Sequence, residues 1–267
     1  MRKEARALGA VLALVLLVPG CGNDDDDEEY PVTVLSEYRP RYDKIRTVLA
    51  ESASHLPQER PARNACSRAM TPKLSVADYE HEHEEVTDNA ELFMQDDLTS
   101  ADVPENRDTP ASLDRFTVLP GYLARGLRIT GPKGPLGSND FKVGPDYGET
   151  YDVEKDPGRR LAKILDAGLG MRYVVALRVL KYTPPDVKSV PEEVGWGQYA
   201  VGEVTVDAFV IDLKQGDIPC HLRARGQSGH SVWWTEGTAE QAIYKDIRES
   251  LSIEVYDTLR KIGAGSA

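Results

Sequence analysis

The sequence is short of positive charge. Its 267 residues include 32 lysines and arginines against 44 aspartates and glutamates, which gives a formal net charge of −12. The phosphate backbone of a nucleic acid would be repelled by a protein with this balance. We therefore exclude a nucleic-acid partner.

The sequence also lacks complete motifs of several enzyme classes. The Gly- and Pro-rich stretch 131–138 does not have the glycine and lysine spacing of a phosphate-binding loop, and we predict a surface loop there. Around Ser228, His230 stands where the nucleophile-elbow pattern Gly-x-Ser-x-Gly has its final glycine. A hydrolase centred on Ser228 remains as a third interpretation, but we assign no catalytic residue and no cofactor.

The apolar run 7–18 is too short to cross a bilayer as a helix, which takes about 20 residues. It follows basic residues within 2–6 and ends shortly before Gly20-Cys21, so we interpret 1–20 as a signal peptide. A small residue followed by cysteine resembles the lipobox of bacterial lipoproteins. The resemblance implies that Cys21 is acylated, for example with palmitate, and anchors the protein to a membrane of the cell envelope, at the outer membrane or facing the periplasm.

Cysteine is scarce, with three in the chain. If Cys21 is acylated, Cys66 and Cys220 remain as an even pair, which argues for a disulfide in an oxidising compartment. Such a bridge would close a loop of about 150 residues and stabilise the fold by roughly 5 kcal/mol in the chain-entropy model. Two unrelated buried thiols are the alternative.

Six consecutive acids, residues 24–29, follow the candidate anchor. Like charges extend a chain, so we interpret 21–35 as the lipidated cysteine and a solvated acidic tether. Apolar spacing then predicts a helix from Ser36 to near His55, with Pro40 in its first turn. We expect 36–150 to combine this helix with an irregular, loop-rich cover region.

One segment of that cover region is dense in metal-ligand side chains. His81 and His83 would share a face of an extended chain, and Glu85 follows them. A metal or small-ligand site at these three residues is our second interpretation, beside a solvated charged surface. We expect loop over 86–110, with at most one helical turn at 90–94, and loop again over 109–148.

Regular structure dominates 151–267, which we predict to be an α/β core with a C-terminal helix. Asp156 and Pro157 open a helix, and the apolar stretch 171–182 is typical of a strand buried on both faces. Alternating apolar residues predict a hairpin of 202–213 and 220–226, and a long amphipathic helix starts near Thr238. The fold class is α+β, with a mixed or antiparallel sheet covered by helices on one face.

This order of elements, with Ala208-Phe209-Val210-Ile211-Asp212-Leu213 before a glycine turn, resembles the α/β domain of certain lipoproteins. These are the curli-secretion lipoprotein, the penicillin-binding-protein activators and uncharacterised lipoproteins of myxobacteria. The resemblance spans about 156–262. It implies binding or assembly without catalysis.

Four residues are candidates for partner binding. Trp233 and Trp234 are adjacent, and in an extended chain they cannot face the same way, so one is expected at the surface. Arg223 and Arg225 are expected on the outward face of the hairpin, where neighbouring acids are their alternative partners. We expect a membrane-anchored, non-catalytic component that binds the bilayer through Cys21 and an envelope protein through these side chains.

Overall fold

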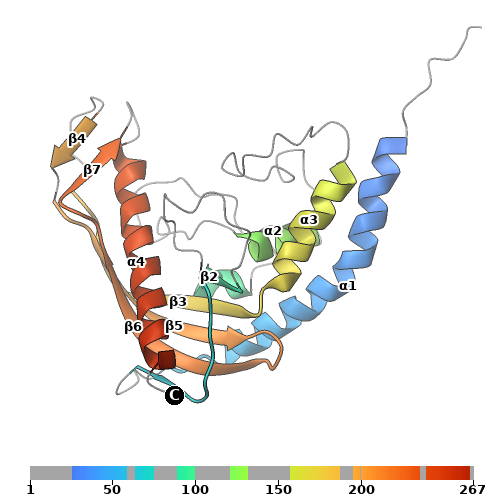
Figure 1. Cartoon of the computed structure of the whole chain (residues 1–267), viewed down its shortest axis with the longest axis horizontal. Coiled ribbons are helices and arrows are strands. Elements are labelled where there is room, and N and C mark those ends of the chain that lie inside the picture. The colour runs from blue at the N-terminus through green and yellow to red at the C-terminus, as the bar shows by residue number, and fades with distance from the viewer. Residues whose placement is uncertain are drawn as a thin grey trace, which may run out of the picture.

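The computed structural model describes residues 26–58, 64–74, 89–99, 121–131, 157–186, 195–198, 200–234 and 239–264. The predicted signal peptide, Cys21 and the candidate metal residues His81, His83 and Glu85 lie outside these ranges. Within them, helices and a five-stranded sheet make an α+β fold, as predicted (Figure 1).

The sheet has the strand order β1-β6-β5-β3-β2. Its strands are β1 (Ala65–Cys66), β2 (Ala90–Met94), β3 (Tyr173–Thr183), β5 (Glu203–Asp212) and β6 (Asp217–Gln227). Only the β2–β3 pair is parallel, so the sheet is mixed. Strands β1 and β2 come from the region that the sequence predicts to be cover, and they form the two edges of the sheet.

The β5–β6 hairpin forms where the sequence predicts it. Its turn includes Gly216, which has a positive φ of 72°, a conformation that glycine adopts without a steric penalty. Along β5 the side chains alternate between two cores: Val210 belongs to one and Phe209 to the other. Cys220 faces inward, as expected, and is buried.

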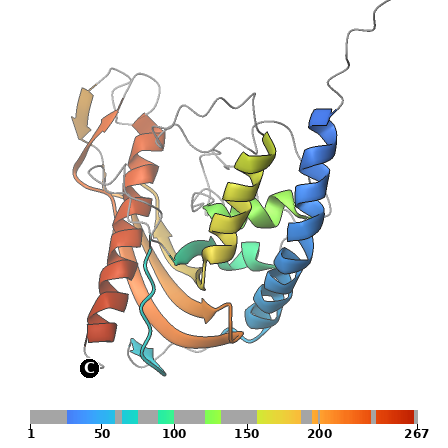
Figure 2. The same cartoon turned by 45° about the vertical axis from the view of Figure 1, so that its right-hand side comes forward.

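Helices cover both faces of the sheet, not one. Helix α4 (Ala239–Ala264) packs on the face that carries Val175 and Leu177, whereas the face that carries Val174 and Ala176 shares a core with three other helices. These are α1 (Asp26–Ser54), α2 (Tyr122–Ile129) and α3 (Pro157–Gly170), which lie together away from α4 (Figure 2). The central part of the sheet is buried on both sides because period-two alternation supplies apolar side chains to each.

Tyr42 of α1 holds the three-helix layer together. Its hydroxyl donates a hydrogen bond of 2.8 Å to the carbonyl oxygen of Leu165 in α3. A Cβ atom at Gly126 of α2 or at Gly168 of α3 would collide with the Tyr42 side chain. The two glycines therefore allow α2 and α3 to approach this tyrosine closely.

Two segments predicted to be irregular have regular structure. The predicted helical turn at 90–94 is instead strand β2, because its backbone pairs with β3 and its side chains alternate between the two cores. The segment 109–148, predicted to be loop, contains helix α2, whose Leu123 and Leu127 are buried. Packing against α3 and the sheet stabilises α2 in spite of the surrounding glycines and prolines.

Helix α1 begins at Asp26, ten residues before the predicted start at Ser36. Part of the predicted acidic tether is therefore helical, and Leu35 within it is buried. Pro40 lies in the helix interior and not in its first turn. Proline there removes a backbone hydrogen bond, which agrees with the bend of the α1 ribbon in Figure 1.

The predicted disulfide between Cys66 and Cys220 is present and joins β1 to β6 across 154 residues of chain. Strand β1 has only two residues, and this bond links it covalently to the sheet. None of the helices in the described ranges has the length and apolar character needed to cross a membrane.

Candidate functional site

The best candidate site is a polar surface that continues the α1–α3 side of the sheet beyond the three helices. The pleat and the strand register place its charged side chains on one face of β3, β5 and β6. We call it the charged strand face. It consists of Arg178, Lys181, Glu203, Asp207, His221, Arg223 and Arg225.

Asp207 and Arg223 form the inner part of this face. Only 3% of Asp207 is exposed, and its Oδ1 accepts hydrogen bonds from Arg223 Nε at 3.0 Å and Nη2 at 2.7 Å. The Arg223 backbone N–H donates to the Asn64 side chain at 2.8 Å. Arg223 is thus committed to a partly buried ion pair with Asp207, which was the alternative that the sequence left open.

Next to this pair, Phe209 lies between two cationic or ionisable side chains. The His221 ring stacks on Phe209 with centroids 4.2 Å apart, and the Arg178 guanidinium lies 4.8 Å from the Phe209 centroid. Burial lowers the pKa of His221, and the positive charges of Arg178 and Arg223 lower it further against the opposing effect of Asp207. His221 is therefore a neutral ring at neutral pH.

Two buried nitrogen atoms of this cluster have no hydrogen-bond partner within the described part of the chain. They are Arg178 Nη2 and His221 Nε2, of which the latter lies 3.9 Å from Asp207 Oδ2. The other Arg178 nitrogens donate to Gln95 Oε1 at 2.6 Å and to the Pro57 carbonyl at 2.7 Å. A buried donor without an acceptor is costly, so Arg178 favours an added acceptor beside it.

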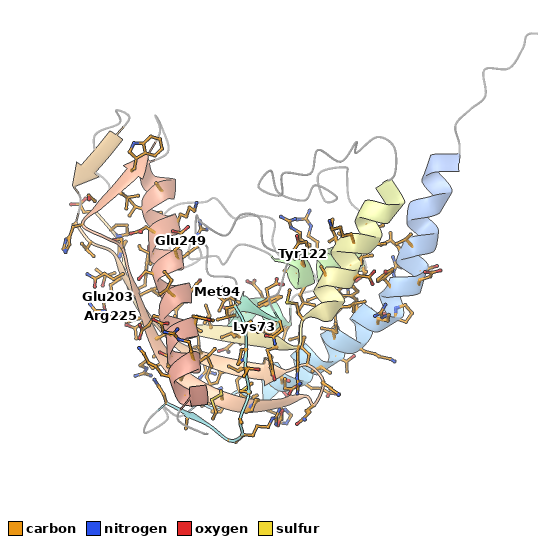
Figure 3. All side chains as sticks on the ribbon, in the orientation of Figure 1. Lys73, Met94, Tyr122, Glu203, Arg225 and Glu249 are labelled. Atoms are coloured by element: carbon orange, nitrogen blue, oxygen red, sulfur yellow. A yellow bond between two sulfur atoms is a disulfide. The ribbon has the colours of Figure 1, made fainter. Side chains whose placement is uncertain are left out.

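Toward the open end of the strands, Arg225 pairs with Glu203 at 2.6 Å. The Arg225 side chain is 57% exposed, and both residues lie on the side of the sheet turned away from α4 (Figure 3). Lys181 and Thr205 continue the same cross-strand row as Arg225. Over the whole face, four cationic side chains outnumber two acidic ones, in a protein whose net charge is −12.

The predicted tryptophan site lies on a separate ribbon of two strands. Strand β4 (Gly195–Gln198) pairs antiparallel with β7 (Ser231–Trp234), and the register sets Trp196 opposite Trp233. Trp233 is 51% exposed, so the expectation that one of the adjacent tryptophans reaches the surface holds for Trp233.

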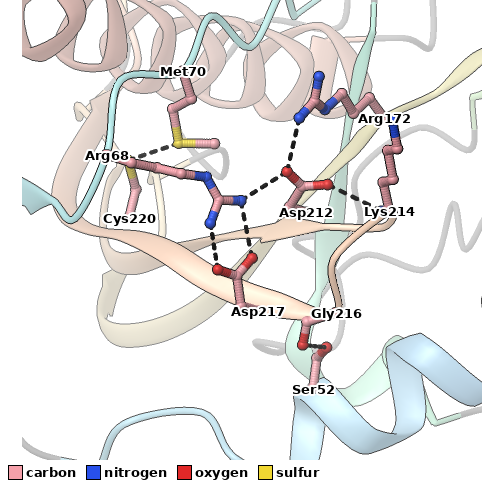
Figure 4. A network of polar contacts seen from close by, with 9 residues as sticks. All are labelled: Ser52, Arg68, Met70, Arg172, Asp212, Lys214, Gly216, Asp217 and Cys220. Atoms are coloured by element: carbon pink, nitrogen blue, oxygen red, sulfur yellow. Dashed lines mark hydrogen bonds and ion pairs between the residues drawn. The ribbon is translucent and has the colours of Figure 1, made fainter.

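A second polar network lies at the β5–β6 turn (Figure 4). Arg68 donates to Asp212 at 2.7 Å and also to Asp217, and Arg172 donates to Asp212 at 3.2 Å. Burial alone would raise the pKa of Asp212, but hydrogen bonds from Arg172, the Lys214 backbone and Arg68 outweigh it and lower that pKa. Both arginines and both aspartates of this network are paired with an opposite charge. The network therefore has a structural role, in which it holds the chain around the β5–β6 turn.

Ser228 has a structural position. Only 3% of it is exposed, and its hydroxyl oxygen accepts a hydrogen bond of 2.9 Å from the Gly202 backbone N–H. The nearby Asp246 accepts the Gly229 backbone N–H at 2.5 Å. These contacts join the end of β6 to its neighbours and give no support to a serine nucleophile.

Glu91 is a buried acid that the sequence interpretation missed. From β2 its carboxylate accepts the backbone N–H groups of Gly121 at 2.9 Å, Leu123 at 2.7 Å and Ala124 at 3.0 Å, and so caps the start of α2. Burial raises the pKa of Glu91 to about 7 in spite of these hydrogen bonds, which lower it. The available signal was a single acid within the otherwise apolar segment 90–94.

The described residues contain no group of three or more His, Cys, Asp or Glu side chains that could hold a metal ion. The candidate metal residues are outside the described ranges, and none of the contacts reported above involves them.

No protein-family model matches the chain, and no curated protein matches it. Among solved structures, the chain is similar to the crystal structure of a "putative lipoprotein" from Caulobacter crescentus, with 17% identity and a TM-score of 0.22. The match covers 36% of this chain and 65% of that one. It therefore spans less than two thirds of that protein, and the likeness is too weak to indicate a shared overall fold.

Proposed function

We propose that the protein is a lipid-anchored component of the cell envelope that binds an acidic surface of an envelope protein without catalysis. The lipobox resemblance at Gly20-Cys21 supports the location. The charged strand face supports the binding role. The buried and structural position of Ser228 favours a binding protein over a hydrolase.

One observation carries this proposal: an acidic protein concentrates cationic side chains on one face of its sheet. Complementary potentials guide association and select partners, so a face with excess positive charge favours an acidic partner. Arg225 and Lys181 are the exposed residues of this face, whereas Arg223 mainly neutralises Asp207.

Photocrosslinking in intact envelopes tests the proposal. A photoreactive phenylalanine analogue replaces Thr205, which lies between Lys181 and Arg225 in the strand register. We expect a crosslink to a discrete envelope protein that is lost in Arg225→Glu. Retention of the same crosslink in Arg225→Glu would contradict binding through the charged strand face.

Arg260→Glu is the matched control. Arg260 on α4 is also exposed and also pairs with one acid, Asp257, at 3.3 Å. Arg260→Glu changes the net charge of the protein by the same amount as Arg225→Glu. Because Arg260 is not part of the charged strand face, the Thr205 crosslink should survive. Loss in both variants would indicate a general effect of charge. Mass spectrometry of the mature N-terminus tests acylation of Cys21 separately.

A further inference from the structure

All three tryptophans of the chain lie on the β4–β7 ribbon. Trp196 is on β4, and Trp233 and Trp234 are on β7. The two strand segments, Gly195–Gln198 and Ser231–Trp234, contain no charged residue. In a chain with a net charge of −12, this uncharged, tryptophan-rich ribbon differs from the rest of the surface.

The ribbon and the start of α1 both lie on the upper side of the molecule, on its two opposite flanks (Figure 1). In Figures 1 and 2 both are at the top, and the C-terminal end of α4 is at the bottom. Cys21 precedes Asp26, the first residue of α1, by five residues. Five residues reach at most about 18 Å when fully extended, so an acylated Cys21 keeps this end of α1 near the bilayer.

We propose that the β4–β7 ribbon is a second membrane contact, with Trp233 in the headgroup region of the bilayer that holds Cys21. The proposal rests on the acylation proposed above and assigns a lipid surface to the ribbon. Tryptophan prefers the membrane–water interface because its ring is apolar and its indole N–H is polar. An uncharged ribbon can also approach anionic lipids, which would repel an acidic surface. Two points of attachment restrict rotation of the protein about its anchor.

The distribution of tryptophan makes the test direct, because intrinsic tryptophan emission reports on the ribbon alone. The acylated mature protein is reconstituted into phosphatidylcholine–phosphatidylglycerol vesicles that contain lipids brominated near the headgroup. We expect emission at shorter wavelength than in lipid-free detergent solution, and loss of intensity with brominated lipids relative to unbrominated ones. Lipids brominated at the end of the acyl chain should quench less.

Variants locate the contact. Trp233→Ala should lose most of the quenching, whereas Ile253→Ala, which truncates an exposed apolar residue on α4, should leave it unchanged. Equal quenching in the Trp233→Ala protein would overturn the role given to Trp233. Vesicle flotation and the mass of the N-terminal peptide confirm that each variant is anchored.

The outcomes separate the two proposals. Acylated protein that floats with the vesicles but has unquenched tryptophans would overturn the ribbon contact and leave the anchor intact. Mature protein without an acyl group would overturn the anchor, and the ribbon proposal with it. Emission that responds only when envelope proteins are added would assign the ribbon to a protein partner and would also overturn the proposal.

Discussion

At the scale of single residues, the two arginines on the outer face of β6 have different roles. Arg223→Ala leaves the buried Asp207 carboxylate without its ion-pair partner, and we expect a loss of about 3 kcal/mol in the free energy of unfolding. Arg225→Ala removes a largely exposed pair and should change it by about 0–1 kcal/mol. Urea denaturation of both variants measures the difference; equal losses would contradict the distinction.

Glu91 gives the protein a defined response to pH. Its pKa is about 7 in the folded state, raised by burial, and returns to an ordinary value near 4.5 on unfolding. The folded state therefore binds more protons than the unfolded state between these values. This contribution to stability is complete below pH 4.5 and is lost as the pH rises through 7.

Glu91→Gln, which cannot titrate, should remove that part of the pH dependence. The free energy of unfolding, measured by urea denaturation from pH 4.5 to 8, should then decline less between pH 4.5 and 7 than in the native protein. The amide that replaces the carboxyl group keeps one acceptor oxygen for the three backbone N–H groups, so a lower stability at pH 4.5 is also expected. An unchanged slope would show that Glu91 is ionised throughout this range.

At the scale of elements, the contact of α1, α2 and α3 depends on two glycines. Gly126→Ala or Gly168→Ala would place a methyl group against Tyr42, and we expect each to lower the free energy of unfolding by about 1–3 kcal/mol. Gly170→Ala is the control, because apart from the adjoining backbone of α3 nothing lies within 4 Å of the position of its added Cβ. It should be neutral or stabilise by up to about 1 kcal/mol.

Thermal unfolding followed by circular dichroism distinguishes the three alanine variants. A melting temperature that falls for Gly126→Ala and Gly168→Ala and not for Gly170→Ala agrees with close packing on Tyr42. Equal shifts at all three positions would instead indicate a general effect of replacing glycine within helices.

The elements that the sequence predicts correctly are those whose patterns lie within one short stretch of the chain. The hairpin has strong alternation and Gly216 in its turn, and α4 has an apolar stripe of five buried residues: Ile243, Ile247, Leu251, Val255 and Leu259. Strand β2 was missed because five residues are too few to separate a strand from a helical turn without knowledge of β3. Helix α2 was missed because its stability depends on α3, which is distant in sequence.

The candidate site was predictable only in part. Arg223 and Arg225 follow from the alternation of β6, and exposure of one adjacent tryptophan follows from the geometry of an extended chain. Arg178 and His221 reach the same face through the pairing of β3 and β6 with β5, which the sequence does not specify. Burial of Asp207 was also not predictable, because its side of β5 begins with polar residues.

At the scale of the whole molecule, the Cys66–Cys220 disulfide joins the two halves of the chain. Reduction, or the Cys66→Ala, Cys220→Ala double variant, should lower the free energy of unfolding by roughly 5 kcal/mol, because a loop spanning 154 residues is released. Urea denaturation with and without a reductant measures the loss. The double variant should not respond to the reductant, and a response in it would indicate an effect unrelated to this bond.

The Cys66–Cys220 disulfide can form only late in synthesis, because Cys220 is added long after Cys66. A growing chain that ends before Tyr173 contains β1 and β2 but none of the strands with which they pair. At ~5–20 residues per second, roughly 8–30 s separate the appearance of Cys66 from that of Cys220. Until Cys220 emerges, Cys66 lacks its disulfide partner, and Cys21 is the only other cysteine present. Acylation of Cys21, which we propose above, would remove this competitor wherever it precedes the emergence of Cys220.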